Sequence, residues 1–316
     1  MPTITTSTLS APIQQSFFRK LLLVPTANFN YKRFSLIKKM PAHGGDTSRS
    51  RRYNPLLTAK VPLGNSGMTP PSQNLTALDI DARLSFYGTW LQLNEQVQLL
   101  AQDPVLNEAT IRLGVSMRQT EDELTREVLV STGSVINCTS GANGDTITEL
   151  TRPDINGVTA ALADANAMTV SDLIEGEDKF GSAPVRDAYW CMASTKLIGD
   201  IDACIGFTAK AQYPTQQAVL RSEYGAVANV RFVLSSISSS TPVASGLGRT
   251  VYNNIVTGMQ SYSNISVDEY NAKLIYRSPM YNDPLAQNCT LGWKMAECPV
   301  ILNDALLVNL RCTRSI

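Results

Sequence analysis

The sequence has a single histidine, His43, among 316 residues. Ser-His-Asp triads, Cys-His pairs and histidine zinc sites need an imidazole held beside other reactive groups, and His43 lies in a loop bounded by Gly and Pro. The G-x-x-x-x-G-K-[ST] phosphate loop is also absent. We therefore expect no catalytic residue, no cofactor and no metal site, and a protein that is not an enzyme.

Fragments of known motifs occur without the residues that would complete them. Ser35-Leu-Ile-Lys38 fits S-x-x-K, but the partner motifs of β-lactamases are missing. Gly246 and Gly248 form only part of a dinucleotide-binding pattern. Two close pairs of acids are interpreted as solvated carboxylates rather than as a divalent-cation site: Asp79 with Asp81, and Asp200 with Asp202.

Long hydrophobic runs are lacking as well. No apolar stretch approaches the roughly 18 residues of a membrane span, and the segment FFRKLLLV is interrupted by Arg19 and Lys20. The six cysteines form no C-x-x-C pair, which is typical of buried free thiols. The sequence thus predicts a soluble cytoplasmic product with no membrane partner.

Charge is scarce and unevenly placed. Asp, Glu, Lys and Arg make up 17% of the chain, below the usual quarter. Residues 1–60 hold ten Lys and Arg and one acid, a net charge of +9, and residues 61–316 hold seventeen bases and twenty-six acids, a net charge of −9. This asymmetry indicates an electrostatic partner for the N-terminal segment, either nucleic acid or the acidic body of a neighbouring subunit, unless the bases are simply solvated.

The first 75 residues offer little that would form a core of their own. Residues 1–15 are rich in Thr, Ser, Gln and Pro, which is typical of a mobile arm. Between Phe17 and Met40 aromatic residues alternate loosely with bases, as in an arm laid over a partner surface. Repeated Pro and Gly in residues 41–75 predict a long extended loop.

Regular structure is predicted from residue 75 onward. Alternation from Leu75 to Leu93 predicts a strand with one apolar face, formed by Leu78, Ile80, Ala82, Leu84 and Phe86. Asp103 and Pro104 begin the strongest predicted helix, which runs to about Val130 with apolar residues three or four apart.

Helices and strands mix without regular alternation in the remainder. We expect a helix after Pro153, a buried strand at Asp187–Ser194, a short helix at Thr195–Ile205 and one strand at Glu223–Leu234. The Ser-rich residues 235–245 are expected to form a loop, followed by β-rich sequence to the C-terminus. The predicted class is α+β.

Several motifs, taken in order, resemble one family. RRYNPL at Arg51–Leu56, PLGNSGMTP, LSFYGTWLQL, DPVLNEAT at Asp103–Thr110, RFV at Arg231–Val233 and LGWKMAECPVILND at Leu291–Asp304 are similar to the major capsid proteins of tailed bacteriophages of the Enquatrovirus (coliphage N-four) type. The resemblance covers most of residues 17–310 and is poorest in residues 166–222 and 235–265.

The resemblance implies the Hong Kong 97-type capsid fold. It implies an N-terminal arm at 1–44 and an extended loop at 45–78. A peripheral domain would comprise 79–149 and 251–316, with a spine helix at about 104–131, and an axial domain would comprise 150–250. The implied role is self-assembly into hexamers and pentamers of an icosahedral shell around packaged double-stranded DNA. The protein would thus be part of the virion, assembled in the host bacterial cytoplasm, with scaffolding, portal and decoration proteins as further partners.

The same resemblance suggests residues for the contacts between subunits. We expect Arg49, Arg51, Arg52 and Tyr53 of the loop to contact a neighbour, with the arginines pairing with acids of its spine helix. The candidate acids are Glu121, Asp122 and Glu123. Lys60 also lies in the loop, but no motif supports a covalent crosslink.

Two other functions stay open from the sequence. The basic N-terminal segment is compatible with a nucleic-acid-binding protein, and salt-dependent DNA binding without shells would favour it. An encapsulin-like protein compartment would share the fold but enclose a protein cargo.

Overall fold

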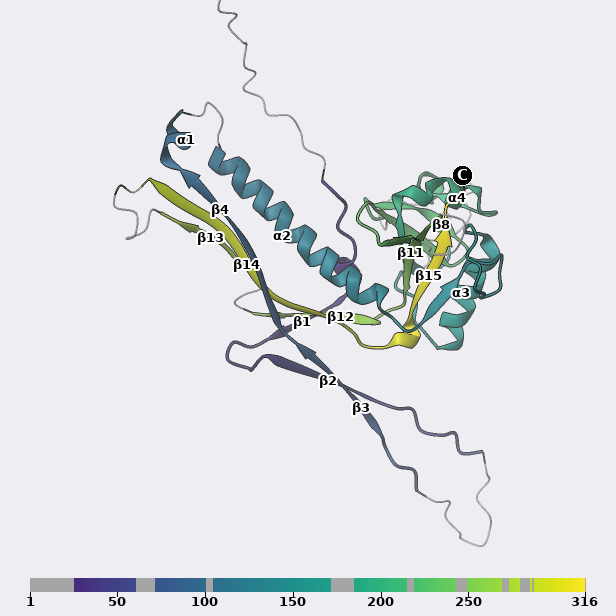
Figure 1. Ribbon diagram of the computed structural model, residues 1–316. Coiled ribbons are helices and arrows are strands. Elements are labelled where there is room, and N and C mark those ends of the chain that lie inside the picture. The colour runs from purple at the N-terminus through teal and green to yellow at the C-terminus, as the bar shows by residue number, and fades with distance from the viewer. Residues whose placement is uncertain are drawn as a thin grey trace, which may run out of the picture.

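The computed structural model describes residues 26–60, 72–100, 105–171, 185–214, 219–242, 249–268, 273–278, 285 and 287–315. The described chain forms an elongated module, a compact module and a two-stranded hairpin that projects from the elongated one (Figure 1). Helices and strands do not alternate regularly, so the class is α+β, as the sequence predicts.

A five-stranded sheet forms the base of the elongated module. Its strands are β1 (Leu36–Met40), β12 (Tyr262–Val267), β14 (Asn288–Ile301), β13 (Lys273–Arg277) and β4 (Ser85–Asn94). The central strand β14 pairs antiparallel with β4 along one edge and with β13 and then β12 along the other. β1 pairs parallel with β12, so residues 36–40 form part of the sheet.

One long helix, α2 (Val105–Val130), lies along this sheet (Figure 1). Its 26 residues span about 39 Å at the usual rise per residue. Its apolar stripe packs onto Leu291, Trp293 and Met295 of β14 and comprises Leu106, Ala109, Leu113, Met117 and Leu124. The predicted helix is confirmed from Val105, while its expected first residues Asp103 and Pro104 lie outside the described residues. The short α1 (Glu95–Leu100) follows β4.

The projecting hairpin consists of β2 (Thr47–Tyr53) and β3 (Ala77–Arg83), paired antiparallel. Only its base joins a core, where Ala82 and Leu84 are buried with Met40 and Ile265. Of the predicted apolar face, Ala82 and Leu84 in the middle are therefore buried, whereas Leu78 and Phe86 at its two ends are exposed. The hairpin has no core because no second layer covers it.

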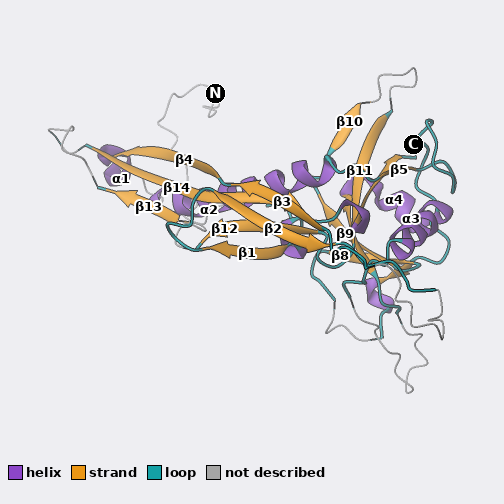
Figure 2. Ribbon diagram, turned by 90° about the horizontal axis from the view of Figure 1, so that it is seen from below, coloured by secondary structure: helices purple, strands orange, loops and turns teal. Residues whose placement is uncertain are grey.

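An eight-stranded sheet organises the compact module. The strand order is β5 (Val135–Asn137), β15 (Leu307–Thr313), β11 (Thr250–Thr257), β6 (Tyr189–Ser194), β9 (Val230–Ser235), β8 (Glu223–Val227) and β7 (Thr208–Ala209), with β10 (Ser240–Pro242) paired to β11. The helices α3 (Arg152–Asp164) and α4 (Ile198–Ala203) lie together beside it (Figure 2). Four 3-10 turns complete the described elements: η1 (Lys32–Phe34), η2 (Thr195–Leu197), η3 (Lys210–Gln212) and η4 (Asp304–Leu306).

Both faces of the central strand β6 are covered. Cys191 and Ala193 face the core shared with α3 and α4, and Met192 faces a second core, which includes Leu129 at the end of α2. All residues of β6 are buried, which confirms the strand predicted within Asp187–Ser194. The helix predicted after Pro153 and the short helix predicted within Thr195–Ile205 are also present.

The pairing of strands differs from the sequence-based expectation in two places. β11 and β15 pair in the sheet of the compact module, whereas the resemblance implies that residues 251–316 share a domain with the spine helix. The single strand expected at Glu223–Leu234 is a hairpin of β8 and β9, which turns at Ala228 with φ of 52°. A turn with a left-handed alanine carries no Gly or Pro signal, so the alternation of the sequence concealed it.

One buried carboxylate joins α3 to the turn that precedes it. Asp154 Oδ1 accepts the amides of Thr139 (3.1 Å) and Gly141 (2.7 Å), and Oδ2 accepts the amide (3.1 Å) and the hydroxyl of Thr151. We expect Asp154→Ala to lower the free energy of unfolding by about 2–4 kcal/mol, because it leaves several amides unpaired. Denaturant titration measures this, with exposed Asp145→Ala as the control; equal losses for both would contradict it.

Candidate functional site

The hairpin carries two arginine–aspartate pairs on one face. Arg49 donates to both carboxylate oxygens of Asp81 (2.7 and 2.9 Å), and Arg51 donates to both of Asp79 (2.6 and 2.9 Å). Each pair joins residues directly opposite in the register of β2 and β3. Two of the predicted contact residues, Arg49 and Arg51, therefore already have partners in their own subunit.

The guanidinium groups change the acid chemistry of this face. Hydrogen bonds from Arg51 and Arg49 lower the pKa of Asp79 and of Asp81, respectively, below the ordinary range of aspartate. Both pairs are exposed to solvent, so they contribute little to folding stability. Their effect is to fix the register of a hairpin that has no core.

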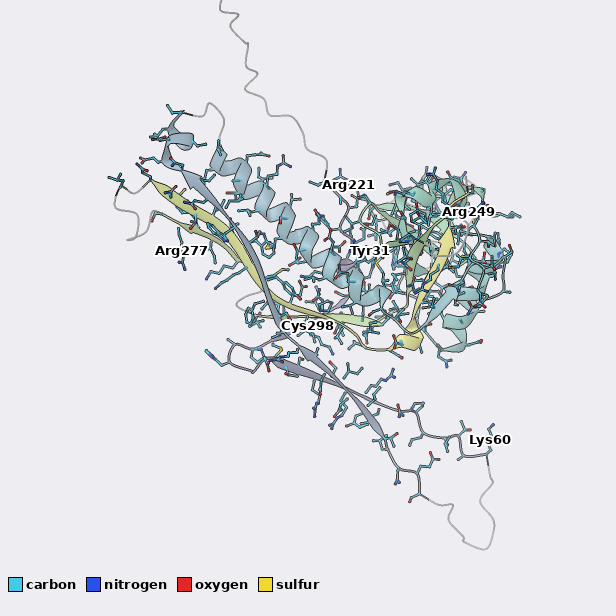
Figure 3. All side chains as sticks on the ribbon, in the orientation of Figure 1. Tyr31, Lys60, Arg221, Arg249, Arg277 and Cys298 are labelled. Carbon is cyan, nitrogen blue, oxygen red and sulfur yellow. The ribbon has the colours of Figure 1, made fainter. Side chains whose placement is uncertain are left out.

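The other two predicted loop residues lie at the outer end of β2. Arg52 and Tyr53 are exposed, Tyr53 by 59%, and they lead to the exposed Leu56 and Leu57. Lys60 lies further along, far from both modules (Figure 3). This stretch presents apolar and cationic groups away from the body of the subunit.

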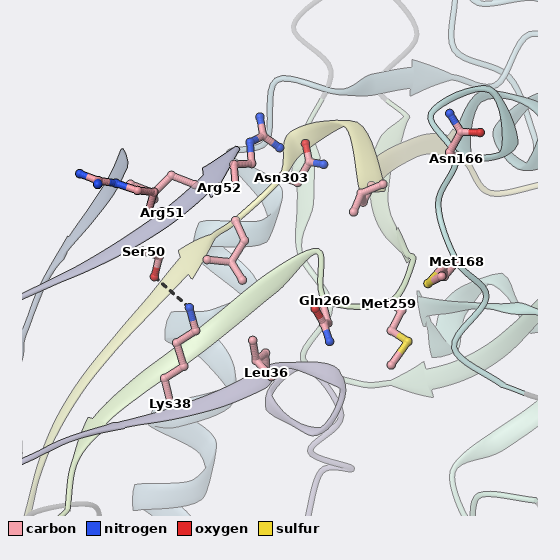
Figure 4. Close-up of a pocket in the computed structure, with 13 residues that line it drawn as sticks. Leu36, Lys38, Ser50, Arg51, Arg52, Asn166, Met168, Met259, Gln260 and Asn303 are labelled. Carbon is pink, nitrogen blue, oxygen red and sulfur yellow. Dashed lines mark hydrogen bonds between the residues drawn. The ribbon is translucent and has the colours of Figure 1, made fainter. Parts of the chain in front are cut away.

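A cavity of about 520 Å³ lies between the hairpin and the body, and Ser50, Arg51 and Arg52 of β2 line it (Figure 4). Lys38 Nζ of β1 donates to Ser50 Oγ of β2 across it, at 2.9 Å. Its walls come from the hairpin, from the sheet of the elongated module and from loops of the compact module that contribute Met168 and Met259. The hairpin and the body are therefore not closely packed against each other in this region.

The acids expected to contact a neighbour are built into a buried joint instead. Asp122 is 1% exposed and accepts the backbone amides of Asn30 (3.0 Å) and Lys32 (2.9 Å). Glu121 is 4% exposed and pairs with Lys32 Nζ at 3.1 Å, and the same ammonium pairs with Glu297 of β14 at 2.7 Å. The segment around Lys32 is thereby held to both the helix and the sheet of the elongated module.

The same segment also binds the compact module. Asn30 Nδ2 donates to the carbonyl of Leu234 (3.1 Å), and Ser222 Oγ donates to Asn30 Oδ1 (2.8 Å). Tyr31 is fully buried between the modules, where the Tyr262 hydroxyl donates to its carbonyl (Figure 3). Residues 28–32 therefore join the two modules.

Burial dominates the electrostatics of this joint. It raises the pKa of Glu297 above the ordinary value, although the Lys32 ammonium opposes the shift. Burial also raises the pKa of Asp122, against the lowering effect of the backbone amides that it accepts. In the folded state, burial therefore makes the charged form of these two carboxylates less favourable than it is in water.

These contacts revise two expectations. Residues 28–40 pack on their own subunit: buried acids accept the amides of Asn30 and Lys32 and pair with the Lys32 ammonium, and β1 joins the sheet. Glu121 and Asp122 would have to leave these partners before they could meet a neighbour's arginines. Glu123, by contrast, is half-buried and accepts from Gln119, so its contact with a neighbour stays a prediction.

The face of the elongated sheet opposite α2 exposes two large aromatic side chains, and the exposed cations Lys273, Arg277 and Lys294 lie on the same face. Phe86 and Trp90 of β4 are exposed by 74% and 64% and, by the alternation of the strand, point away from the side that carries Tyr87 toward the helix. Gly88 and Gly292 lie beside Trp90 in a groove of about 370 Å³. A Cβ on either would come within 3.0 Å of the facing strand, so the strands need glycine here. Phe86 belongs to the predicted apolar face, but the exposure of Phe86 and Trp90 was not predicted, although the absence of charge in β4 could have indicated it.

The described residues contain no group of three or more His, Cys, Asp or Glu side chains placed to hold a metal ion. His43 adopts a left-handed conformation (φ 65°) in an exposed turn. Burial raises the pKa of the Cys204 thiol to about 11, which opposes the reactive thiolate. Among the described helices, none is long and apolar enough to cross a lipid bilayer.

An elongated sheet under a long helix, a compact module and a projecting hairpin define the Hong Kong 97-type capsid fold. No protein-family model matches the sequence, and no curated protein matches it significantly. Solved structures do match the fold over nearly the whole chain. The capsid of Ralstonia phage GP4 matches with a TM-score of 0.71 at 14% identity, covering 99% of both chains. The acidic stable capsid of Helicobacter pylori bacteriophage KHP30 matches at 0.70 and 9% identity, covering 98% of both. The capsid of cyanophage P-SCSP1u matches at 0.65 and 12%, covering 96% of this chain and 94% of that chain.

Proposed function

We propose that this chain is a major capsid protein that self-assembles into the icosahedral shell of a tailed phage around double-stranded DNA. The observation that carries the proposal is the fold match over 99% of the chain, hairpin included, to a phage capsid. The ordered motifs from RRYNPL to LGWKMAECPVILND support the narrower Enquatrovirus type. The role is structural and needs no catalysis.

The proposed domain map follows the sheets. The extended loop is the β2–β3 hairpin with the residues between its strands, and the peripheral domain is the elongated module with α2 as its spine. The axial domain is the compact module, which takes β11 and β15 in addition to residues within 150–250.

The proposed contacts between subunits use what the subunit leaves exposed. Arg52, Tyr53, Leu56 and Leu57 project beyond any core of their own subunit and would be covered by an adjacent copy in hexamers and pentamers. Each contact of this kind is modest, but a closed shell repeats it many times. Packaged DNA and scaffolding, portal and decoration proteins are the further proposed partners, in a virion assembled in the bacterial cytoplasm.

Electron microscopy and the mass in solution of the purified full-length protein test the proposal. We expect closed, uniform shells, and double-stranded DNA rather than a protein cargo in particles recovered from infected cells. A protein cargo would favour the encapsulin-like alternative.

A second outcome would favour the nucleic-acid-binding alternative: only small species that bind DNA in a salt-dependent way, even with a scaffolding protein added. The structure reduces the support for it, because Lys32, Lys39 and Arg49 of the basic segment pair with acids of their own chain.

A further inference from the structure

The cavity between the hairpin and the body has an apolar wall and a cationic wall (Figure 4). The apolar wall belongs to the body and includes Met168 and Met259, which are exposed by 72% and 47%. The cationic wall comes from β1 and β2 and carries Lys38, Arg51 and Arg52. No Asp or Glu is among the 13 described residues that line the cavity. Its volume of about 520 Å³ falls within the usual range of small-molecule sites.

Lys38 has no charged partner on this wall. Its side chain is half-buried, and its ammonium donates to the hydroxyl of Ser50 at 2.9 Å. The next residue, Lys39, pairs with Asp268, and Arg51 pairs with Asp79, whereas no described carboxylate pairs with Lys38. A partly buried ammonium without a counter-charge is costly, so this position favours an anionic ligand.

Backbone hydrogen bonds hold the apolar wall in place. The amide of Met259 donates to the carbonyl of Met168 at 3.0 Å and so joins the two loops that carry these side chains. The amides of Leu302 and Asn303 both donate to the carbonyl of Ser261, at 2.9 and 3.0 Å. Methionine side chains adapt to irregular apolar surfaces and are common where a protein binds varied partners. The wall is therefore pre-formed and presents two flexible side chains that a ligand would cover.

We propose that this cavity binds a medium-chain fatty acid as its carboxylate. The carboxylate accepts from the Lys38 ammonium, and the alkyl chain lies against Met168 and Met259. A cationic ligand would meet like charges, and a small inorganic anion would leave the methionines uncovered, so neither complements both walls. The bound fatty acid would contact the hairpin and the body and fill the space between them. This site is independent of the proposed capsid function, so shells need not form for it to be tested.

Isothermal titration calorimetry of the full-length protein with decanoate, below the concentration at which micelles form, tests the site. We expect saturable binding of one decanoate per chain. Decanol lacks the carboxylate and acetate lacks the chain, so each should bind at least about tenfold more weakly.

Variants at neighbouring lysines test the role of the ammonium. Lys38→Met should lower the affinity for decanoate to that for decanol, because only the charge is lost. Lys39→Met is the matched control and should bind decanoate like the unaltered chain, because that ammonium pairs with Asp268 instead. Equal affinities of the unaltered chain for decanoate and decanol, or an unchanged affinity in Lys38→Met, would overturn the proposal.

A protection experiment locates the ligand and does not require Lys38→Met to fold. Met168→Cys introduces an exposed thiol, whereas the native cysteines are buried or half-buried. Decanoate at ten times its dissociation constant should slow alkylation of this thiol by iodoacetamide about tenfold, since only the unoccupied fraction reacts. Ile205→Cys, exposed and outside the cavity, should react at an unchanged rate.

Two further results would contradict the site. One is alkylation of Met168→Cys that decanoate does not slow. The other is binding to vesicles of phosphatidylglycerol without any binding of decanoate, which would indicate a lipid surface rather than a free fatty acid. Either result would leave the capsid function standing, because none of these measurements depends on shell formation.

Discussion

Lys32→Met should destabilise the folded subunit by about 3–5 kcal/mol at neutral pH. Its ammonium is the shared partner of two buried carboxylates, Glu121 at 3.1 Å and Glu297 at 2.7 Å. Removing one member of a buried ion pair leaves an uncompensated charge, which is far more costly than losing an exposed pair. Urea titration of the purified subunit measures the loss.

Two rescue experiments distinguish lost charge from lost packing. The double variant with Lys32→Met and Glu297→Gln should recover part of the stability, because the amide removes one of the two unpaired charges at nearly constant volume. Lys39→Met serves as the matched control: its partner Asp268 is exposed, so a change below about 1 kcal/mol is expected. Equal losses of unfolding free energy in Lys32→Met and Lys39→Met would contradict the prediction, because the buried ion pairs would then stabilise the fold no more than an exposed one.

Acidification should act in the same direction as the Gln substitution. The pKa of Glu297 is raised in the folded state by burial, so the folded protein binds a proton more readily than the unfolded chain. The stability linked to this group is present below the ordinary pKa of 4.5 and is lost as pH rises through the raised value. Lys32→Met should therefore lose less stability, relative to the native chain, at mildly acidic than at neutral pH. A loss that does not vary with pH would contradict this assignment.

The elements that were predicted correctly are those that a local pattern of residues determines. The stripe of α2 is readable because apolar residues recur every three or four positions, and the structure uses it against β14. The strand at Tyr189–Ser194 can be predicted because all its residues but the last, Ser194, are largely apolar, as expected of a strand covered on both faces. Pro and Gly recur in residues 41–75, which predicts an extended segment without a core of its own, but the strand β2 within this segment contains neither residue.

Local sequence patterns do not show which residue a charged side chain will pair with. From the sequence, Glu121 and Asp122 look like acids on the exposed surface of a helix. In the structure they are buried against the segment around Lys32, about 90 residues earlier, whose ammonium pairs with Glu121 and whose amide donates to Asp122. Arg51 looks free for a neighbour, but a cross-strand register places Asp79 opposite it. Both outcomes depend on long-range pairing, and the same holds for β11 and β15, which local alternation cannot assign to one sheet rather than another.

We expect the arginines of the hairpin to have two different roles. Arg49 and Arg51 pair with aspartates of the same hairpin, and we expect Arg52 to contact a neighbouring subunit. Arg51 has its partner Asp79 in the same subunit, so exchanging the charges in Arg51→Asp with Asp79→Arg should preserve the cross-strand pair, the net charge and assembly. Arg52 is exposed at the outer end of β2, so Arg52→Glu should leave the unfolding free energy within about 0.5 kcal/mol and lower shell yield about tenfold or more.

Shell yield by sedimentation and electron microscopy, together with a denaturation curve for each variant, checks both expectations. Arg51→Glu alone breaks the internal pair and brings two carboxylates face to face, so it should impair assembly while the exchange restores it. If the exchange also fails to assemble, Arg51 itself contacts the neighbour, because the internal pair is intact in that variant. If Arg52→Glu forms normal shells, the contact lies elsewhere on the hairpin, and the apolar residues Tyr53, Leu56 and Leu57 must carry it.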